Sequence, residues 1–261
     1  MLGAFSTCLA QDEEQARRFR RLGARDVGMV GDLKAAAAAL PVDPPQLEQL
    51  ARRIKKRPLW LAASTHTGEE EIAAHVHRQV AADHPDLLTI IVPRHPARGD
   101  AIHATLAARG LRVARRRRGE PITDQTDVYL ADTMGELGLF YRLAGIAFVG
   151  GSLVAKGGHN PLEAARLGCA VLHGPDTRNC ARMAAELAAA GATETVSDAD
   201  GLAQAVSALL GDRHLRAERA AAGKRVATAG SDILDAVLMR LAPWLDRLAS
   251  LESRPDSRLQ A

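Results

Sequence analysis

A regular alternation of short apolar runs and amphipathic stretches dominates the sequence from residue 58 onward. The apolar runs, rich in Val, Ile, Leu and Ala, lie at 59–63, 87–92, 111–114, 127–131, 146–149, 169–172 and 193–196. Helical patterns lie between most of them, at 69–82, 98–109, 136–144, 161–167 and 179–190. Continuous apolar strands separated by helices are typical of a parallel sheet covered on both faces. We therefore predict an α/β fold with a doubly wound, Rossmann-like parallel sheet.

The flanking segments suggest four parts. Residues 1–34 contain a strand at 5–10, a helix at 12–22 and a strand at 26–30, which together form a β-α-β piece. An Ala-rich run at 35–39, followed by Pro41, Pro44 and Pro45, predicts a linker over residues 35–57. The main domain is expected at 58–232, and a C-terminal helix and tail at 233–261.

Composition excludes several classes of protein. Three cysteines without a CxxC pair argue against a disulfide framework and for a reducing cytosol. No apolar run approaches the roughly 20 residues of a membrane helix, so any membrane contact is expected to be peripheral. The net charge of +3 suits an anionic ligand, whereas 3% aromatics do not suit a single-strand nucleic-acid binder. Nucleic acid is not expected as a partner, and no cofactor is expected.

Ligands of doubly wound sheets bind outside the carboxyl ends of the strands. The loops there are 64–68, 93–98, 132–135, 150–160 and 173–178. The loop at 150–160 has four glycines with Lys156 and His159, and it runs into a helix with Asn160 at the N-cap and Glu163 at N3. We expect an anion site there, with Glu163 accepting hydrogen bonds from ribose. A capping box of Asn160 and Glu163 is an equally open explanation.

Three further loops carry polar side chains. Ser64 and Thr65 are candidates to hold phosphate, although Thr67 and Glu70 have the spacing of a cap. Arg94, His95 and Arg98 follow a buried strand, where a structural need for such a cluster is rare, so an anion-binding role is favoured. Gly135 would let a base or ribose approach the backbone, but Thr133 and Glu136 also have cap spacing.

Two charged segments receive structural explanations. The basic run at 115–118 is expected to be a solvated loop, with contact to an anionic surface as the lesser alternative. Asp198 and Asp200 resemble the metal-binding DxD of glycosyltransferases, but they follow Ser197 at a helix start and are expected to cap it. No metal is expected.

Taken together, the loops resemble the donor domain of bacterial Kdo (3-deoxy-D-manno-octulosonate) transferases. The motifs that carry the resemblance are ADTMGELGLFY at 131–141, FVGGS at 148–152, GGHNPLE at 157–163, STHTGE at 64–69, PRHP at 93–96 and GPDTRN at 174–179. They occur in the family's order and spacing, and the resemblance runs from about residue 9 to about residue 241.

The resemblance implies the C-terminal half of a GT-B glycosyltransferase that binds CMP-Kdo. The donor-binding residues that it implies are Ser64, Thr65, His66, Arg94, Met134, Gly135, Glu136, Gly158, His159, Asn160 and Glu163. It also implies inverting, metal-independent transfer of Kdo to a lipid A precursor (lipid IVA) in lipopolysaccharide biosynthesis. The enzyme would act at the cytoplasmic face of the inner membrane. The catalytic base and most of the acceptor domain would lie in an N-terminal domain of which residues 1–34 are a remnant.

Two alternatives remain open from the sequence. One is a non-catalytic nucleotide-sugar-binding fragment that needs a partner chain. The other is a different GT-B enzyme, or an epimerase, that uses UDP-sugars, and a preference for cytidine over uridine would separate it from a Kdo transferase. If the rest of their sheet is absent, residues 5–30 would also present unpaired strand edges, which are typical sites of aggregation or docking.

Overall fold

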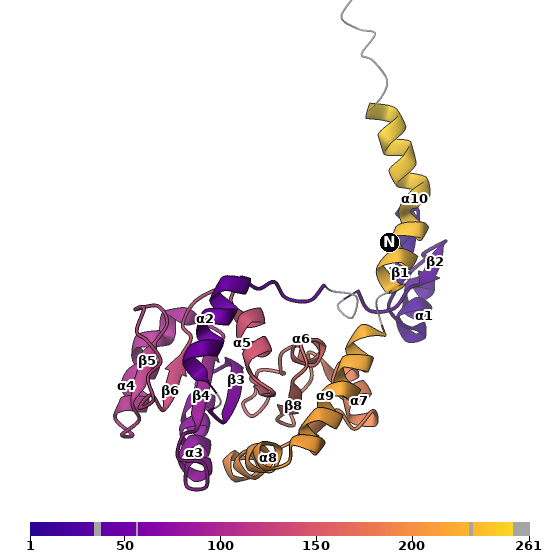
Figure 1. Cartoon of the computed structure of the whole chain (residues 1–261). Coiled ribbons are helices and arrows are strands. Elements are labelled where there is room, and N and C mark those ends of the chain that lie inside the picture. Colours follow the sequence, from indigo (N-terminus) through magenta and orange to yellow (C-terminus); the bar gives the residue numbers. More distant parts are fainter. Residues whose placement is uncertain (34–37, 56, 230–231, 253–261) are drawn as a thin grey trace, which may run out of the picture. The chain divides into compact units, whose positions relative to one another are not determined.

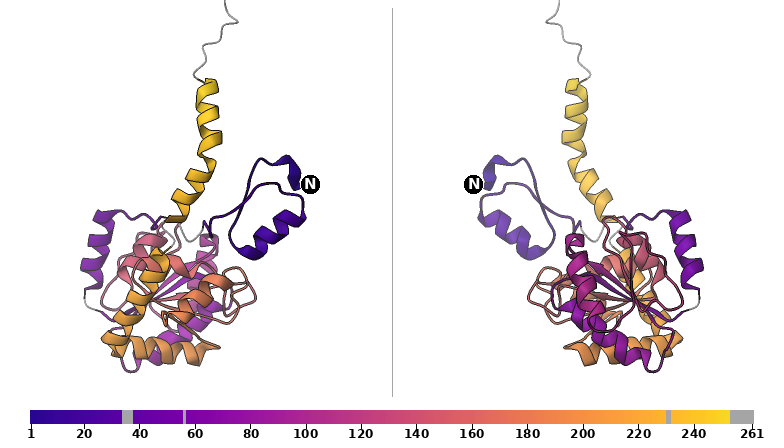
Figure 2. Two further views of the ribbon diagram at one scale, coloured as in Figure 1. Left: turned by 90° about the vertical axis from the view of Figure 1, so that its right-hand side faces the viewer. Right: turned by 90° about the vertical axis from the view of Figure 1, so that its left-hand side faces the viewer.

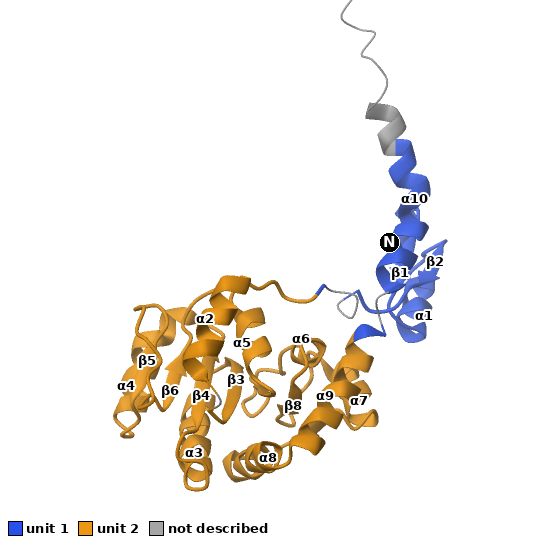
Figure 3. Ribbon diagram, viewed as in Figure 1, with its two compact units in different colours: residues 1–38, 228–261 blue, residues 39–227 orange. Residues whose placement is uncertain are grey.

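The chain forms two compact units in a computed structural model that describes residues 1–33, 38–55, 57–229 and 232–252. Unit 1 comprises residues 1–38 and 228–261, and unit 2 comprises residues 39–227 (Figure 3).

Unit 2 is built on a seven-stranded, entirely parallel sheet. Its strands are β3 (Leu59–Thr65), β4 (Leu88–Pro93), β5 (Val113–Arg115), β6 (Val128–Leu130), β7 (Ile146–Val149), β8 (Ala170–His173) and β9 (Thr193–Thr195). They lie in the order β5-β6-β4-β3-β7-β8-β9. From the central strand β3 the chain first builds β4 and its neighbours on one side, and later β7 to β9 on the other. The predicted α/β fold with a doubly wound parallel sheet is confirmed.

Helices cover both faces of this sheet (Figures 1 and 2). They are α2 (Pro44–Ile54), α3 (Glu69–Ala81), α4 (Gly99–Ala107), α5 (Leu137–Leu143), α6 (Pro161–Arg166), α7 (Ala181–Ala189), α8 (Ala199–Gly211) and α9 (Arg213–Thr228), with a 3-10 turn η2 (Pro96–Arg98). Because strand side chains alternate between faces, Trp60 and Ala62 of β3 join one core cluster with α3, α4 and α8. Leu61 and Ala63 of the same strand point to the opposite face.

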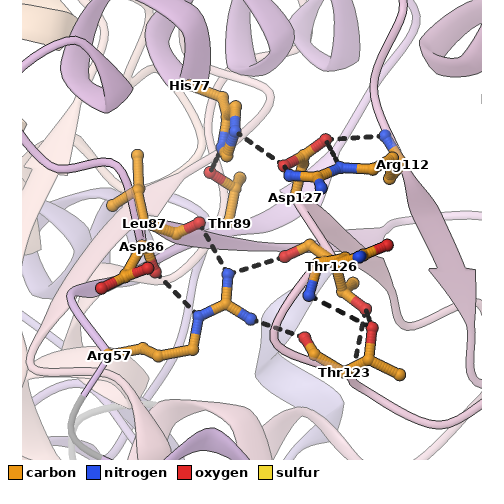
Figure 4. Close-up of polar contacts among 10 residues, drawn as sticks. Arg57, His77, Asp86, Leu87, Thr89, Arg112, Thr123, Thr126 and Asp127 are labelled. Atoms are coloured by element: carbon orange, nitrogen blue, oxygen red, sulfur yellow. Dashed lines mark hydrogen bonds and ion pairs between the residues drawn. The ribbon is translucent and has the colours of Figure 1, made fainter.

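Arg57 ties together the amino ends of the strands (Figure 4). Its guanidinium donates hydrogen bonds of 2.7–3.0 Å to the backbone carbonyls of Asp86, Leu87, Thr123 and Thr126. Beside it, the buried Thr89 hydroxyl lies 2.8 Å from Trp60 Nε1 and 2.9 Å from His77 Nδ1. Burial lowers the pKa of His77, so this imidazole is neutral near pH 7. This edge of the sheet is therefore held by internal polar contacts.

The predicted linker contains a helix that was not expected from the sequence. Within α2, Leu50 and Ile54 are buried four residues apart on one face, which is the spacing of a packed helix. Pro44 and Pro45 occupy its first turn, where the missing amide hydrogen costs no intrahelical bond, so they start the helix instead of breaking it. From residue 39 onward the segment belongs to unit 2. Residues 34–37 and Lys56 lie outside the described residues.

Unit 1 contains η1 (Leu2–Ala4), β1 (Cys8–Ala10), α1 (Glu13–Arg21), β2 (Val27–Met29) and α10 (Asp232–Glu252). Strands β1 and β2 pair in parallel, with Leu9 opposite Gly28. Asp12 caps α1 by accepting a 2.7 Å hydrogen bond from the Gln15 amide. The first strand begins at Cys8, three residues later than predicted. No helix in the described parts of the chain is both long and apolar enough to cross a membrane.

Candidate functional site

The loops after β3 and β7 meet where the winding of the sheet reverses. Strands β3 and β7 are neighbours although their sequence positions are far apart. Each is followed by one of the polar loops singled out in the sequence. In open α/β sheets this reversal point is the usual place for a ligand. The candidate site therefore centres on these two loops.

Glu69, which was not among the predicted site residues, joins the two loops. Its buried carboxylate accepts hydrogen bonds from the His66 amide at 2.9 Å and the Gly151 amide at 2.7 Å. It also accepts hydrogen bonds from the amides of Ser152 at 3.1 Å and Leu153 at 3.2 Å. The amides of Gly151, Ser152 and Leu153 are thus occupied by an internal carboxylate, whereas the anion site expected from the sequence lay further along, at the amides that open the helix at Asn160. In the sequence, the only local sign of this role was that Glu69 is an acidic residue in the first turn of a predicted helix.

Three imidazoles gather at the site. The Nε2 atoms of His66 and His159 lie 2.9 Å apart, with nearly parallel rings, and the His95 ring centroid is 5.8 Å from that of His66. Burial, with the neighbouring His66 and Arg94, lowers the pKa of His159 to about 4. Burial also lowers the pKa of His66. Both rings are therefore neutral near pH 7, and at 2.9 Å one nitrogen must donate the hydrogen bond that the other accepts.

Arg94 supplies the available positive charge after β4. Its side chain is exposed, and no hydrogen bond or ion pair engages it among the described residues. Arg98 differs, because its guanidinium pairs with the buried Glu70 through two hydrogen bonds of 2.8 and 3.0 Å. The expectation that both arginines bind an anionic ligand is therefore wrong for Arg98, whose guanidinium is already paired with a carboxylate of the protein.

Ser64 and Thr65 differ in what they offer a ligand. The Thr65 side chain is fully buried, and its hydroxyl donates to Glu70 at 2.9 Å. Ser64 is half-buried with φ of +56°, a left-handed conformation that is uncommon outside glycine. Of the two predicted phosphate ligands, only Ser64 has a hydroxyl that makes no hydrogen bond among the described residues.

Two arginines of the basic run hold the loop that contains Met134, Gly135 and Glu136. Arg115 is 3% exposed and binds Asp132 at 2.6 Å and Asp100 at 2.5 Å. Arg116, pointing to the other side of the strand end, pairs with Glu136. This pairing lowers the pKa of Glu136 and raises that of Arg116. The prediction of a solvated loop is wrong for these two residues, because Arg115 pairs with the buried Asp132 and Arg116 pairs with the half-buried Glu136.

Met134 and Gly135 are exposed at the tip of this loop, with 72% of Met134 accessible to solvent. Gly135 has φ of +80°, and no atom lies within 4 Å of the position that a Cβ would take. Gly135 and Glu136 border a cavity of about 150 Å³ whose opposite wall is the start of α2. Glu136 also accepts a hydrogen bond from the Thr133 hydroxyl, but the helix cap that their spacing suggested does not form, because α5 begins at Leu137 and Glu136 at its N-cap makes no side-chain cap hydrogen bond.

At the start of α6, Asn160 acts as a helix cap. Its side-chain oxygen accepts a 3.0 Å hydrogen bond from the Leu162 amide, and its side-chain nitrogen lies 3.4 Å from Glu163 Oε1. Burial raises the pKa of Glu163. Gly158 has φ of +71° and packs against the 174–179 loop, where a Cβ would come within 2.9 Å of the Asp176 carbonyl oxygen. A ligand role for Asn160, Gly158 or Glu163 stays a prediction, since the cap explains part of the geometry.

The DxD-like carboxylates are both engaged. Asp198 accepts a 2.8 Å hydrogen bond from the Gly201 amide, which confirms the predicted cap. Asp200 Oδ1 lies 2.8 Å from His75 Nε2 and accepts a hydrogen bond from Gln79. Within the described ranges, no group of three or more His, Cys, Asp or Glu side chains has an arrangement that could hold a metal ion.

Comparison with known proteins points to one group of relatives. The chain is 37% identical over 260 residues to a 3-deoxy-D-manno-octulosonic acid transferase of Haemophilus influenzae, a match that covers 95% of this chain and 59% of that protein. It is 38% identical over 181 residues to a probable mitochondrial enzyme of the same name from Arabidopsis thaliana, covering 67% of this chain and 40% of that protein. The chain thus spans about two fifths to three fifths of these relatives. No protein-family model matches it.

The most informative solved structure is the C-terminal CMP-Kdo binding domain of WaaA from Acinetobacter baumannii. It is 33% identical, with a TM-score of 0.67, and the match covers 70% of this chain and 96% of that domain. Anabaena HepE, solved with UDP-glucose, has a TM-score of 0.55 at 15% identity, which shows likeness of fold alone. These neighbours are GT-B glycosyltransferase domains, and the predicted GT-B fold class is confirmed.

Proposed function

Because this chain belongs to the family of Kdo transferases, we propose that unit 2 binds CMP-Kdo at the carboxyl edge of its sheet. The observation that carries the proposal is the 33% identity to a CMP-Kdo binding domain over 96% of that domain. The motif residues support it, because they follow the adjacent strands β6, β4, β3 and β7 and so share one edge.

The chemistry of the edge suits a departing nucleotide. When the glycosidic bond breaks, CMP leaves as a phosphate monoester and gains negative charge that fixed donors can stabilise. Arg94 offers an unengaged guanidinium for that phosphate. His66 and His159 are neutral hydrogen-bonding groups beside it, and Ser64 adds a hydroxyl. In this proposal Met134 to Glu136 receive the nucleoside, and Gly158, Asn160 and Glu163 lie near the ribose and phosphate.

We further propose that the complete protein transfers Kdo to a lipid A precursor such as lipid IVA. The names of the relatives support Kdo as the transferred sugar. Inversion at the anomeric carbon, independence of metal, and a carboxylate base in the N-terminal domain are parts of this proposal. Unit 1 would be a β-α-β piece of that domain. The enzyme would work peripherally at the cytoplasmic face of the inner membrane.

Calorimetric titration with CMP and UMP tests the donor half of the proposal. CMP should bind the 261-residue chain more tightly than UMP. Arg94→Ala should weaken CMP binding by about tenfold to a hundredfold, because a charge-assisted phosphate contact is lost. Glu163→Ala should weaken it less.

Arg117→Ala, an exposed member of the basic run, is the control and should bind CMP like the unaltered chain. Absence of CMP binding by the folded, unaltered chain would refute the proposal that unit 2 is a working donor domain.

A further inference from the structure

The start of α2, predicted from sequence to be part of a linker, forms one wall of the cavity beside Gly135. The cavity is lined by residues 41–43, Gln46, Gly135, Glu136 and Leu139. Its volume of about 150 Å³ is well below the roughly 300–1,000 Å³ of sites that enclose a whole small molecule. It therefore suits one ring of a larger ligand whose remainder lies outside.

A chain of hydrogen bonds orients the polar groups of this wall. Arg116 Nη2 donates to Gln46 Oε1 at 2.5 Å, which turns the amide nitrogen of Gln46 away from the arginine. That nitrogen donates to Asp43 Oδ2 at 2.9 Å. The orientation of the Gln46 amide is thus fixed by a guanidinium, which has no acceptor to offer.

Asp43 retains an unused acceptor. It occupies the N-cap position of α2, yet its side chain makes no cap hydrogen bond. Asp43 is exposed, and among the described residues its Oδ1 accepts no hydrogen bond. Glu136, the other carboxylate of the cavity, is instead engaged by Arg116 and Thr133. Asp43 Oδ1 is therefore a carboxylate oxygen at this cavity that can accept a hydrogen bond from a ligand without displacing a donor of the protein.

The cavity lies at the same sheet edge as the cationic and imidazole groups. It borders the loop after β6, and β6 is the neighbour of β4, which precedes Arg94. The strand beyond β4 is β3, which leads to His66. Adjacent strands are about 4.8 Å apart, so the cavity and the His66 loop are separated by roughly 10 Å along the edge. A nucleotide could place its phosphate at one end and its base at the other.

We propose that this cavity receives the pyrimidine ring of the nucleotide and that the Asp43 carboxylate selects cytosine over uracil. The inference rests on the proposed binding of CMP-Kdo. Cytosine carries an amine donor at C4, whereas uracil carries a carbonyl acceptor there. The carboxylate accepts a hydrogen bond from the amine and repels the carbonyl oxygen, so it provides both attraction and rejection. Pro41, Val42 and Leu139 supply apolar contacts to the ring, and the open backbone at Gly135 lets it approach.

Calorimetric titration of the full chain with CMP and with UMP tests this inference through the ratio of the two dissociation constants. In the unaltered chain the UMP constant should exceed the CMP constant by about tenfold or more, as for a good polar contact to a base edge. Asp43→Asn and Asp43→Ala should weaken CMP binding and leave UMP binding unchanged or tighter, so that the ratio falls toward one. Glu48→Gln removes an exposed carboxylate from the same helix and should leave the ratio unchanged.

The outcomes separate this inference from the proposed function. An unchanged ratio in both Asp43 variants, or an equal loss of CMP and UMP binding, would overturn the role of Asp43 while leaving nucleotide binding intact. Equal binding of the two nucleotides by the unaltered chain would also overturn it. If the unaltered chain binds neither, the proposed function fails and the inference fails with it. Matching urea midpoints for all variants would show that the differences arise in the site.

Discussion

Unit 2 and unit 1 both contain parallel β-α-β structure, but they bury it to very different extents. In unit 2 the central strands have neighbours on both sides, and large side chains such as Trp60, Phe140 and Phe148 are almost completely buried. In unit 1 the sheet is a single pair, so β1 and β2 each have one strand edge without a partner in the pair.

The apolar side chains repeat this contrast. Among the described residues of unit 1, the buried apolar side chains are Ala10, Ala16 and Val237, while Phe5 and Met29 are 58% and 62% exposed. Parallel strands are stable when both faces are covered, and two strands alone provide too little area for that. The comparison teaches that the β-α-β pattern specifies local structure, whereas the number of strands decides whether a core forms.

The largest expected difference is in hydrogen exchange of the full chain. Amides of Leu61 to Ala63 in β3 should exchange only through global unfolding of unit 2, which for a domain of this kind costs about 5–15 kcal/mol. Amides of β1 and β2 should exchange through local opening with a free energy several kcal/mol smaller. Mass spectrometry of exchanged peptides measures both. Equal protection in the two units would show that the comparison is wrong.

Removing a buried charge should destabilise unit 2 strongly. In Arg115→Leu, the buried Asp132 loses its cationic partner, which should lower the free energy of unfolding by about 3–5 kcal/mol. Urea denaturation measures the loss. Arg117→Leu replaces an exposed neighbour and should change stability by no more than about 0.5 kcal/mol. A similar effect of both substitutions would mean that the Arg115–Asp132 pair is not closed in solution.

Altering the connection between the β3 and β7 loops should have a smaller effect. In Glu69→Gln a neutral amide replaces the carboxylate that accepts four backbone hydrogen bonds, and its NH₂ group faces backbone donors. We expect a loss of about 2 kcal/mol in unfolding free energy and weaker CMP binding. Glu186→Gln, an exposed carboxylate on α7, is the control for the change of charge. Unaltered stability in Glu69→Gln would contradict the role given to Glu69.

The two units should also differ in their response to acid, since all nine histidines lie between residues 66 and 214. His159 has a folded-state pKa of about 4, against about 6.5 when unfolded. Above pH 6.5 the imidazole is neutral in both the folded and the unfolded state. Between pH 6.5 and 4 only the unfolded state gains the proton, so the free energy of unfolding decreases as the pH is lowered through that window. The partly exposed ring should contribute about 1 kcal/mol.

Urea titrations at pH 7.5 and 5 test this linkage. In His159→Asn the loss of stability between these pH values should shrink, and in His214→Asn, which alters an exposed imidazole, it should stay the same. An identical pH dependence in His159→Asn and the unaltered chain would show that His159 is not held neutral by the fold.

The smallest expected effect concerns an exposed apolar residue of unit 1. Met239 is 72% exposed, so Met239→Gln should change the stability of the isolated chain by less than about 0.5 kcal/mol. Thermal denaturation provides the measurement. A loss above 1 kcal/mol would mean that Met239 is buried in solution and that unit 1 has a larger core than its described contacts show.

The sequence by itself determined most of the secondary structure of unit 2, the class of its sheet and the edge at which the candidate site lies. These follow from local periodicity and from the rule that parallel strands place their following loops at one edge. Most elements therefore begin and end within about two residues of their predicted bounds. The helix α2 was missed because prolines and an alanine run resemble a linker. Whether such prolines start a helix depends on whether the apolar face of the following segment packs against the rest of the fold.

Only the tertiary structure decided which side chains remain available in the site. His66 and His159 are 93 residues apart in sequence and meet because β3 and β7 are adjacent, an order that periodicity does not reveal. Sequence periodicity also does not reveal that Glu69 accepts hydrogen bonds from amides of the glycine-rich loop. Nor does it reveal the ion pairs that Arg98, Arg115 and Arg116 form with carboxylates of other segments. Charge and spacing indicate which groups can bind an anion, but pairing across the fold determines which of them are already taken.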